Sequence, residues 1–350
     1  MSATSRFQAP IRWGILGCGD VCEVKSGPAF QNAENSELVA VMRRDGAKAQ
    51  DFAARHGVPF WTNDADELIA RPDVDAVYIA TPPGSHLELA LRVAEAKKPC
   101  YVEKPMARSA AECRTMIQAF EATNTPLFVA FYRRGLERFQ TVKRLLEEKA
   151  IGEMTSISYR LNVAPSNDSP DSLPWRLEAE EAGAGLFYDL ASHLLDVFDY
   201  MFGPLENVTG IATNAASPNL AVEDSVAMSF SVGNVTGSGS WNFASWGRAD
   251  RIEIWGDRGK ISLSCFGGDD VRLESSDGLK TFNGKLPPHV HQGLVQTIVD
   301  ELLGTGSALS TGETALRTMT VMDTVLNSYY GGRDDEFWKR SNSWPKNRVP

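Results

Sequence analysis

Two residues that can exchange protons stand four positions apart in the second half of the chain, Asp189 and His193. If this segment is a helix, the spacing puts both side chains on one face. A histidine near a carboxylate takes or gives a proton close to neutral pH, as the oxidation of an alcohol requires of a general base. The alternative is a polar stripe on a solvated helix. A separate apolar stripe would dock the same helix on a sheet, so the pair need not lie in the core: Leu190, Leu194, Val197 and Met201.

A lysine with related chemistry, Lys104, lies in the segment 102–105 (VEKP), directly after a short apolar run typical of a buried strand. At the carboxyl end of a strand, an ammonium group can hydrogen-bond a substrate hydroxyl or stabilise an alkoxide as hydride leaves. Its charge acts more strongly once water is excluded. Without context, the same tripeptide EKP is typical of an ordinary charged loop.

A glycine-rich turn, residues 17–22 (GCGDVC), follows the apolar run Ile11–Leu16 and precedes a predicted helix. In a dinucleotide-binding turn the first glycine permits the tight bend, and the second lets backbone N–H groups approach a pyrophosphate at the helix N-terminus. The third position, usually Gly or Ala, holds the small side chain of Cys22. An ordinary βα loop is the alternative for this motif alone. The predicted cofactor contacts of the turn are Gly17, Gly19, Asp20 and Val21.

The segment after the second predicted strand bears on the choice of cofactor, because Arg43, Arg44 and Asp45 follow that strand. A carboxylate at this location would accept hydrogen bonds from the ribose hydroxyls of NAD. Guanidinium groups instead hold a 2′-phosphate in a bidentate fork, so Arg43 and Arg44 favour NADP. The alternative is NAD, with Asp45 as the ribose acceptor and both arginines solvated.

A proline-rich turn, residues 81–86 (TPPGSH), follows the predicted strand that ends at Ala80. Its prolines prevent a helix from starting early and fix the backbone beside the expected nicotinamide ribose. For His86, which begins a helix, a structural or surface role is the alternative. The predicted cofactor contacts at these strand ends are Thr81, Pro82, His86, Glu103 and Lys104.

The elements that must position these residues follow a βαβ rhythm in the first half of the chain, which predicts a parallel sheet. The predicted strands are Ile11–Leu16, Glu37–Met42, Val74–Ala80, Pro99–Val102 and Leu127–Phe131. The predicted helices are Val24–Ala33, Asp45–His56, His86–Ala96 and Ser109–Thr123. Right-handed crossovers then give a doubly wound α/β fold, whose ligands lie at the carboxyl ends of the strands.

After about Gly152 the rhythm changes to alternating strands separated by turn residues, which predicts an antiparallel sheet. Residues 256–259 (GDRG) are predicted to be a hairpin loop. Pro165–Pro174 is rich in Ser, Asp, Asn and Pro and is predicted to be a mobile excursion, a kind of segment from which lids are often built. The predicted strands are Ser156–Val163, Ser225–Val232, Ser238–Phe243 and Arg251–Trp255, and the closing helices are Gln292–Leu303 and Gly312–Tyr329.

Composition excludes several classes of protein. A chain of 350 residues with 43% hydrophobic content is long enough for two domains with separate cores. The formal net charge of -10 disfavours nucleic-acid binding. No apolar stretch is long enough to span a membrane, and Met1–Pro10 lacks a secretory pattern, so we expect a cytoplasmic protein. The five cysteines are scattered and complete neither a disulfide framework nor a metal site.

Taken together and in this order, the motifs GCG (17–19), TPP with His86, EKP (103–105) and Asp189 with His193 resemble one family over nearly the whole chain. It is the glucose-fructose oxidoreductase, inositol dehydrogenase and rhizopine-catabolism (Gfo/Idh/MocA) family. The resemblance implies an α/β Rossmann domain with a parallel doubly wound sheet, expected at residues 1–130. It also implies an α+β C-terminal domain with a large, mainly antiparallel open sheet at residues 131–350, which binds substrate and forms a homodimer or homotetramer.

The resemblance further implies catalytic roles for Lys104, Asp189 and His193, with a cis peptide bond before Pro105. The implied activity is hydride transfer between NAD or NADP and a hydroxyl or carbonyl carbon of a sugar, inositol or related polyol, without a metal.

Substrate contacts are also expected after the predicted strand Leu127–Phe131 and before the Asp189 helix. For Arg133 the alternative is an ion pair at the domain junction. His289 and His291 are predicted to be structural or rim residues. The predicted substrate contacts are Lys104, Tyr132, Arg133, Trp175, Arg176, Asp189 and His193.

Two other functions stay open. One is a glycosidase that uses tightly held NAD in a redox-neutral cycle. Arg43 and Arg44 disfavour it, because they favour NADP, and an exchangeable NADP suits net redox chemistry. The other is a noncatalytic nucleotide-binding sensor, which the three catalytic residues disfavour because a sensor has no need of proton transfer.

Overall fold

The computed structural model describes residues 7–165, 174–217 and 220–344, apart from the side chain of Ser343. The chain divides into two compact units, each made of segments that are distant in the sequence. The predicted ranges 1–130 and 131–350 differ from these units mainly at residues 287–316, which belong to the first unit. The first unit comprises Met1–Ala107, Glu112–Leu136 and Pro287–Leu316, and the second comprises Arg108–Ala111, Glu137–Leu286 and Arg317–Pro350.

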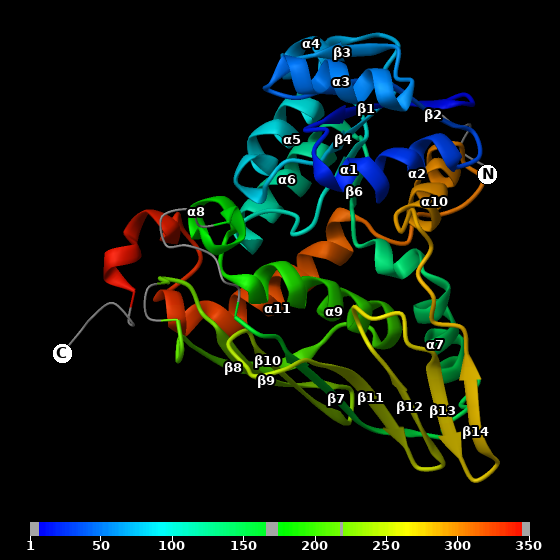
Figure 1. Cartoon of the computed structure of the whole chain (residues 1–350), viewed down its shortest axis with the longest axis vertical. Coiled ribbons are helices and arrows are strands. Elements are labelled where there is room, and N and C mark those ends of the chain that lie inside the picture. The colour runs from blue at the N-terminus through cyan, green and yellow to red at the C-terminus, as the bar shows by residue number, and fades with distance from the viewer. Residues whose placement is uncertain (1–6, 166–173, 218–219, 345–350) are drawn as a thin grey trace. The chain divides into compact units, whose positions relative to one another are not determined.

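The first unit contains a six-stranded parallel sheet in the order β3-β2-β1-β4-β5-β6 (Figure 1). This is the doubly wound order, which reverses between β1 and β4 and opens a ligand crevice at the carboxyl ends of the strands. The central strand β1 pairs on both sides, with Ile15 opposite Val41 of β2 and opposite Tyr78 of β4. The strands are β1 (Ile11–Leu16), β2 (Ser36–Met42), β3 (Phe60–Thr62), β4 (Ala76–Ile79), β5 (Cys100–Val102) and β6 (Leu127–Val129).

Helices connect these strands, and α3 shows how local sequence sets their bounds. Asp45 accepts a hydrogen bond from the N–H of Lys48 at its start, and Gly57 ends it with a φ of 67°. The helices are α1 (Asp20–Val24), α2 (Gly27–Asn32), α3 (Gly46–His56), α4 (Ala65–Ala70), α5 (His86–Glu95), α6 (Ala110–Thr123) and α10 (Gln292–Leu302), with short 3-10 turns at Pro83–Ser85 and Tyr132–Gly135.

The predicted helix Val24–Ala33 corresponds to α2, which begins three residues later, at Gly27, because a separate short helix, α1, ends at Val24. Gly27 begins α2 so close to α1 that a Cβ on it would lie 2.2 Å from the carbonyl oxygen of Cys22. Ser26, which lies between the two helices, donates a hydrogen bond from its hydroxyl to the carbonyl of Val21. The break therefore follows from the close approach of two backbones, which helical spacing does not reveal.

The core of the first unit is aromatic, with Trp13, Phe30, Tyr78 and Tyr101 fully buried and their rings in contact. Helix α10 packs against α2, although some 260 residues separate them, and adds apolar side chains to the same core. This packing explains why residues 287–316 belong to the first unit. The side chains added by α10 are Leu294, Val295, Ile298, Val299 and Leu302.

The second unit contains an eight-stranded sheet in the order β14-β13-β12-β11-β7-β10-β9-β8. The pairs are antiparallel except β10 with β7, so the predicted mainly antiparallel sheet is confirmed. The predicted hairpin loop 256–259 connects β11 to β12. The strands are β7 (Met154–Asn162), β8 (Glu206–Thr213), β9 (Ser225–Val232), β10 (Val235–Asn242), β11 (Ala249–Gly256), β12 (Gly259–Leu263), β13 (Val271–Ser275) and β14 (Gly278–Phe282).

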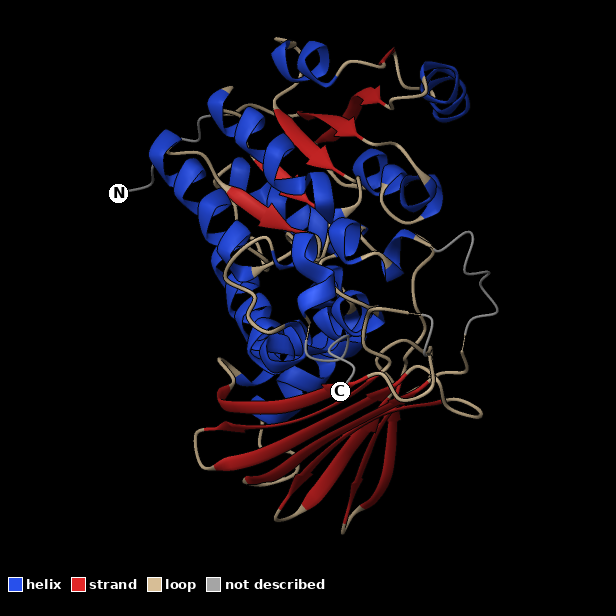
Figure 2. Cartoon of the chain, turned by 90° about the vertical axis from the view of Figure 1, so that its left-hand side faces the viewer, coloured by secondary structure: helices blue, strands red, loops and turns tan. Residues whose placement is uncertain are grey.

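Helices α9 and α11 lie along one face of this sheet, and within the described residues no helix covers the opposite face (Figures 1 and 2). Strand β9 alternates accordingly, with Val226, Met228 and Phe230 buried and Ala227 and Ser229 exposed. The sheet is therefore open on one side. The remaining helices are α7 (Glu137–Glu147), α8 (Ala179–Ala182), α9 (Leu186–Phe202) and α11 (Gly312–Tyr330), with 3-10 turns at Trp175–Leu177 and Phe337–Ser343.

Among the described residues, none of the helices combines the length and the apolar character that crossing a membrane requires. The five cysteines are all buried, and none of them forms a disulfide bond. The same part of the chain contains no group of three metal-ligating side chains.

Candidate functional site

The glycine turn after β1 has the geometry that a dinucleotide-binding turn needs. Gly17 has a φ of 88°, and a Cβ on it would lie 2.6 Å from the Cγ2 atom of Thr81. The N–H groups of Gly17 and Cys18 both donate to the carbonyl of Met42, at 2.8 and 3.1 Å. The turn thus packs against the ends of β2 and β4, and only glycine fits at position 17.

The second glycine leaves open space. A Cβ on Gly19 would meet only the carbonyl oxygen of Gly17, at 3.8 Å, so a group from outside can approach the backbone there. Gly19 directly precedes α1, which begins with Asp20 and Val21. Cys22, at the third position of the motif, is fully buried, and this burial raises the pKa of its thiol. These features fit the pyrophosphate of a dinucleotide.

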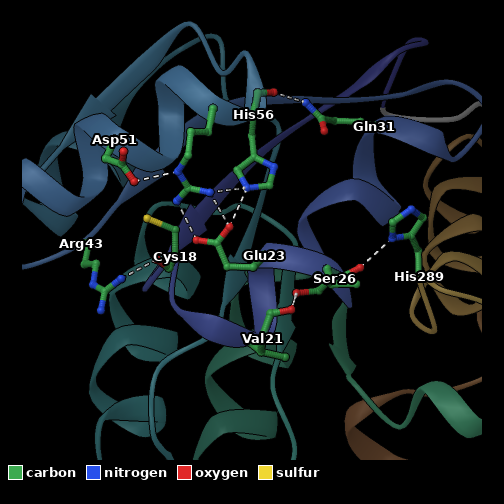
Figure 3. Close-up of polar contacts among 11 residues, drawn as sticks. Cys18, Val21, Glu23, Ser26, Gln31, Arg43, Asp51, His56 and His289 are labelled. Carbon is green, nitrogen blue, oxygen red and sulfur yellow. Dashed lines mark hydrogen bonds and ion pairs between the residues drawn. The ribbon is translucent and has the colours of Figure 1, made fainter.

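Arg43 lies against the glycine turn, because its guanidinium donates to the carbonyl of Cys18 at 3.3 Å (Figure 3). Arg44 is exposed, and Asp45 caps α3. Burial raises the pKa of the Cys18 thiol to about 11. Of the two arginines, Arg43 is therefore already oriented beside the turn.

A charged cluster that the sequence analysis missed joins α1 to α3 beside this turn (Figure 3). Arg55 donates to both oxygens of Glu23, at 2.7 and 2.8 Å, and to Asp51 at 2.7 Å. His56 contacts the same carboxylate at 2.9 Å. The hydrogen bonds from Arg55 lower the pKa of Glu23 to about 2. The spacing of Asp51 and Arg55 was a usable signal, but nothing in the sequence pointed to Glu23.

The predicted cofactor contacts after β4 include a fully buried histidine. Nε2 of His86 lies 2.7 Å from the carbonyl oxygen of Thr81, and Nδ1 lies 3.1 and 3.2 Å from those of Pro105 and Met106. Burial lowers the pKa of His86 to about 4. The ring therefore joins the turn after β4 to the loop after β5, while Pro82 immediately precedes the 3-10 turn.

The loop after β5 turns the carboxylate of Glu103 inward. This side chain is buried and accepts hydrogen bonds from the hydroxyl of Tyr78, at 2.5 Å, and from the N–H of Lys104, at 3.0 Å. The peptide bond between Lys104 and Pro105 is cis, as predicted. Glu103 therefore fixes the backbone from which the side chain of Lys104 starts.

A buried histidine from a distant segment joins this arrangement. His291 has Nδ1 3.1 Å from the hydroxyl of Tyr101 and Nε2 3.6 Å from Glu103, and its ring stacks on Tyr132. Burial lowers the pKa of His291 to about 3, so the imidazole beside Glu103 is neutral. Of the two predicted possibilities for His291, a structural or a rim position, its complete burial fits the structural one. His289 is partly exposed, with Nδ1 2.6 Å from the carbonyl of Val24.

Two further predicted residues of the first unit, Tyr132 and Arg133, lie in the 3-10 turn after β6. The guanidinium of Arg133 is buried and lies 5.0 Å from the ring of Tyr132. Arg134 donates to the carbonyl of Leu309 at 3.1 Å. The turn thus brings a buried cation next to an aromatic ring, in the geometry of a cation–π interaction.

In the second unit, Asp189 and His193 lie on one face of α9, as predicted. Both side chains are buried, so the alternative of a polar stripe on a solvated helix is wrong. Nε of Arg176 donates to Asp189 at 3.2 Å, and the imidazole of His193 lies 6.0 Å from the ring of Phe266, at 78°. Helix α9 is buried along most of its length because α7 and β9 pack against it.

One oriented residue, Arg176, lies just after the predicted mobile segment Pro165–Pro174. Arg176 stacks on Trp175, 4.3 Å from the ring, and its side chain is half exposed. Of Pro165–Pro174, residues 166–173 lie outside the described residues. Arg176 thus carries an exposed cation next to the buried carboxylate of Asp189.

The start of α9 is held by buried charges that the sequence analysis missed. Glu223 accepts a hydrogen bond from the N–H of Gly185, and its second partner is the hydroxyl of Tyr330. Arg333, 1% exposed, donates to the carbonyl of Gly183 at 2.9 Å and to Asp323 at 2.6 Å. Glu223 lies 38 residues from Gly185, and Arg333 lies 150 residues from Gly183, so no local pattern indicated them.

Both units match known protein-family models. Residues 11–131 match the oxidoreductase family with an NAD-binding Rossmann fold, and residues 139–262 match the Gfo/Idh/MocA C-terminal domain. The chain belongs to the Gfo/Idh/MocA family. The predicted resemblance and fold class are therefore confirmed, and this Gfo/Idh/MocA protein is an oxidoreductase with an NAD(P)-binding Rossmann domain.

Individual relatives agree with this assignment. An oxidoreductase of Formosa agariphila is 37% identical over 325 residues, which are 92% of this chain and 100% of the relative. The inositol 2-dehydrogenase of Rhizobium meliloti is 28% identical over 275 residues, 77% of this chain and 80% of that protein. A solved structure of levoglucosan dehydrogenase with NADH has a TM-score of 0.80 at 24% identity, covering 90% of this chain and 96% of the other. This last likeness shows the shared fold of the Gfo/Idh/MocA proteins.

Proposed function

We propose that this protein transfers a hydride between a nicotinamide cofactor and a hydroxyl or carbonyl carbon of a sugar, inositol or related polyol. The observation that carries the proposal is the retention of Lys104 after β5 together with Asp189 and His193 on one face of α9. Names of relatives, such as inositol 2-dehydrogenase, support the substrate class. The protein would be cytoplasmic and work as a homodimer or homotetramer.

Each predicted catalytic residue has a distinct task in this proposal. Lys104 donates a hydrogen bond from its ammonium group to the substrate oxygen and stabilises negative charge that develops there. His193 takes the hydroxyl proton during oxidation and returns it during reduction. Asp189 sets the charge and orientation around the imidazole, and Arg176 donates a hydrogen bond to this carboxylate.

The residues around the glycine turn fit a nicotinamide dinucleotide, which would supply the hydride acceptor or donor. Gly17, Gly19, Asp20 and Val21 would lie at its pyrophosphate, and Arg43 beside its adenosine ribose. In this assignment residues 1–130 bind the nucleotide, and residues 131–350 bind the substrate and mediate oligomerisation. Thr81, Pro82, His86, Glu103 and Lys104 would form or support the nicotinamide side.

We favour NADP over NAD because Arg43 is oriented beside the turn and Arg44 stands next to it, so two guanidinium groups are available for a 2′-phosphate. Arg43→Ala should weaken NADP more than NAD in titrations of cofactor binding. Arg43 also bonds the glycine turn, so its loss could disturb the turn itself. Arg44 is exposed, and Arg44→Ala therefore tests phosphate binding separately from support of the turn. Equal losses for NAD and NADP in both variants would contradict the preference.

The substrate would be bound by Lys104, Asp189 and His193 together with neighbouring aromatic and cationic side chains. Arg176 is half exposed beside Asp189, which supports a role in holding hydroxyl groups. The other proposed contacts are Tyr132, Arg133 and Trp175.

One experiment separates the candidate activities. Purified full-length protein is incubated with a panel of sugars, inositols and polyols plus NAD or NADP, and both nicotinamide absorbance and sugar products are followed. A net absorbance change supports the dehydrogenase. Sugar product without net absorbance change would indicate the redox-neutral glycosidase, and cofactor binding with neither would indicate the sensor.

Variants test the assigned residues. Lys104→Ala and His193→Ala should each abolish turnover while cofactor affinity stays within a few-fold, because both act on the substrate. Lys149→Ala, which removes an exposed lysine paired with Glu153, is the matched control and should behave like wild type. Wild-type turnover in either catalytic variant would reject that residue's role.

A further inference from the structure

The loop after β12, residues 264–270, is fixed by two charged side chains of opposite sign. Asp250 of β11 accepts N–H hydrogen bonds from three successive residues of the loop. The donors are Cys265 at 2.9 Å, Phe266 at 2.7 Å and Gly267 at 3.3 Å. The hydroxyl of Tyr159 also donates to this carboxylate, at 3.1 Å. Both oxygens of Asp250 are therefore used to hold the loop and its neighbouring strand.

The positive partner is Arg138 of α7, whose side chain is 2% exposed. It donates to carbonyl oxygens on the other side of the same loop: Ser264 at 2.9 Å, Asp269 at 3.1 Å and Gly267. Hydrogen bonds with a charged partner are stronger than neutral ones. The loop lacks the repeating bonds of a helix or strand, yet its N–H and C=O groups are held in one conformation.

The residue that this loop presents is Phe266. Its N–H is bound to Asp250, its side chain is partly exposed, and its ring meets the imidazole of His193 nearly edge to face at 6.0 Å. Helix α7, which carries Arg138, packs directly against α9, which carries His193. The anchor, the aromatic ring and the imidazole thus belong to one packed group within the second unit.

We propose that Phe266 is a substrate-positioning residue, an aromatic wall that packs against the C–H face of the sugar or polyol bound at His193. The proposal rests on the proposed function. The face of an aromatic ring carries partial negative charge, and the C–H bonds of a sugar ring offer a partly positive, apolar surface to it. Arg138 and Asp250 hold the ring in place before substrate arrives, which lowers the entropic cost of binding.

The test compares three variants of the full chain by steady-state kinetics with the best sugar or polyol of the panel. Phe266→Leu keeps an apolar side chain but removes the ring, and should raise KM for the sugar about tenfold, a loss of about 1.4 kcal/mol. Its KM for the cofactor and its kcat should stay within about threefold of wild type, because the ring contributes to sugar binding and takes no part in proton or hydride transfer. Phe266→Tyr keeps the ring and should restore the wild-type KM.

A matched control is Phe60→Leu, which makes the same change at a partly buried phenylalanine of the edge strand β3 in the first unit. It should leave KM for the sugar unchanged, whereas a general loss of stability would affect both variants. Asp250→Asn replaces one acceptor oxygen by a donor that faces loop N–H groups. It should raise KM for the sugar in the same direction as Phe266→Leu.

The outcomes distinguish the two levels of the proposal. If His193→Ala is inactive but Phe266→Leu keeps the wild-type KM, the aromatic wall is rejected and the proposed function stands. If Phe266→Tyr raises KM for the sugar as much as Phe266→Leu does, the aromatic ring is not the group that binds the sugar. That result also rejects the proposed role of Phe266. If His193→Ala turns over normally, or no sugar or polyol is turned over, the proposed function fails. If Asp250→Asn does not fold, the Leu and Tyr variants at position 266 still decide the matter.

Discussion

The glycine turn of the first unit and the start of α9 in the second unit are held in place by different means. The turn is fixed by its own backbone, since Gly17 has a positive φ and its N–H donates to Met42. The start of α9 is fixed by buried charged side chains from distant segments, Glu223 and Arg333. A backbone constraint leaves a mark in the local sequence, whereas a long-range side-chain constraint does not.

The largest effect is expected from Arg333→Met, which removes the cation that holds the turn before α9. Asp323 and the carbonyls of Gly183 and Arg108 would lose buried partners, so unfolding should cost about 3–5 kcal/mol less than in wild type. Chemical denaturation measures this difference. Arg144→Met, at an exposed arginine paired with Glu148, is the control, and its stability should change by about 1 kcal/mol or less. Similar effects in both variants would mean that buried charges do not hold α9.

An intermediate effect is expected at the glycine turn. Gly17→Ala puts a Cβ 2.6 Å from Thr81 at a φ of 88°, and should lower stability by about 1–3 kcal/mol and weaken cofactor binding. Gly19→Ala has no such clash and is the matched control, so its stability should stay near that of wild type while cofactor affinity falls. Thermal unfolding and cofactor titration measure the two quantities. Equal stability of the two variants would show that the backbone conformation of Gly17 does not fix the turn.

The smallest effect is expected from Glu23→Gln, which breaks the charged cluster between α1 and α3. The pKa of Glu23 is about 2 in the folded protein, chiefly because Arg55 donates to it, and about 4.3 in an unfolded chain. Ionised Glu23 therefore stabilises the fold fully above about pH 5, and this contribution disappears as the pH falls toward 2.

At pH 7 the variant should be about 1 kcal/mol or less below wild type, because the pair is partly exposed. The gap should narrow on acidification, as measured by denaturation at several pH values. Arg55→Gln should lose a similar amount, and the double variant should lose little more than either single one. A gap that widens in acid would contradict the role of Glu23.

Much of the fold could be predicted from the sequence because its signals are local. Asp45 and Gly57 mark the two ends of α3, and the strands β1 and β9 have the predicted bounds. The predicted elements differ from the structure where their bounds or packing depend on long-range contacts. The break between α1 and α2 depends on how closely Gly27 approaches Cys22, and α10 joins the first unit through packing against α2.

Among the predicted site residues, the sequence determined which residue types stand at strand ends and on the face of α9. Spacing of 3.6 residues per turn and the requirement for glycine at a positive φ operate over a few residues. The tertiary structure alone decided that the carboxylate of Glu103 points inward to Tyr78, that Asp189 is bound by Arg176, and that Phe266 lies beside His193. Such contacts depend on which distant segments share a low-dielectric interior, where each buried polar group must find a partner, and spacing along the chain does not specify that partner.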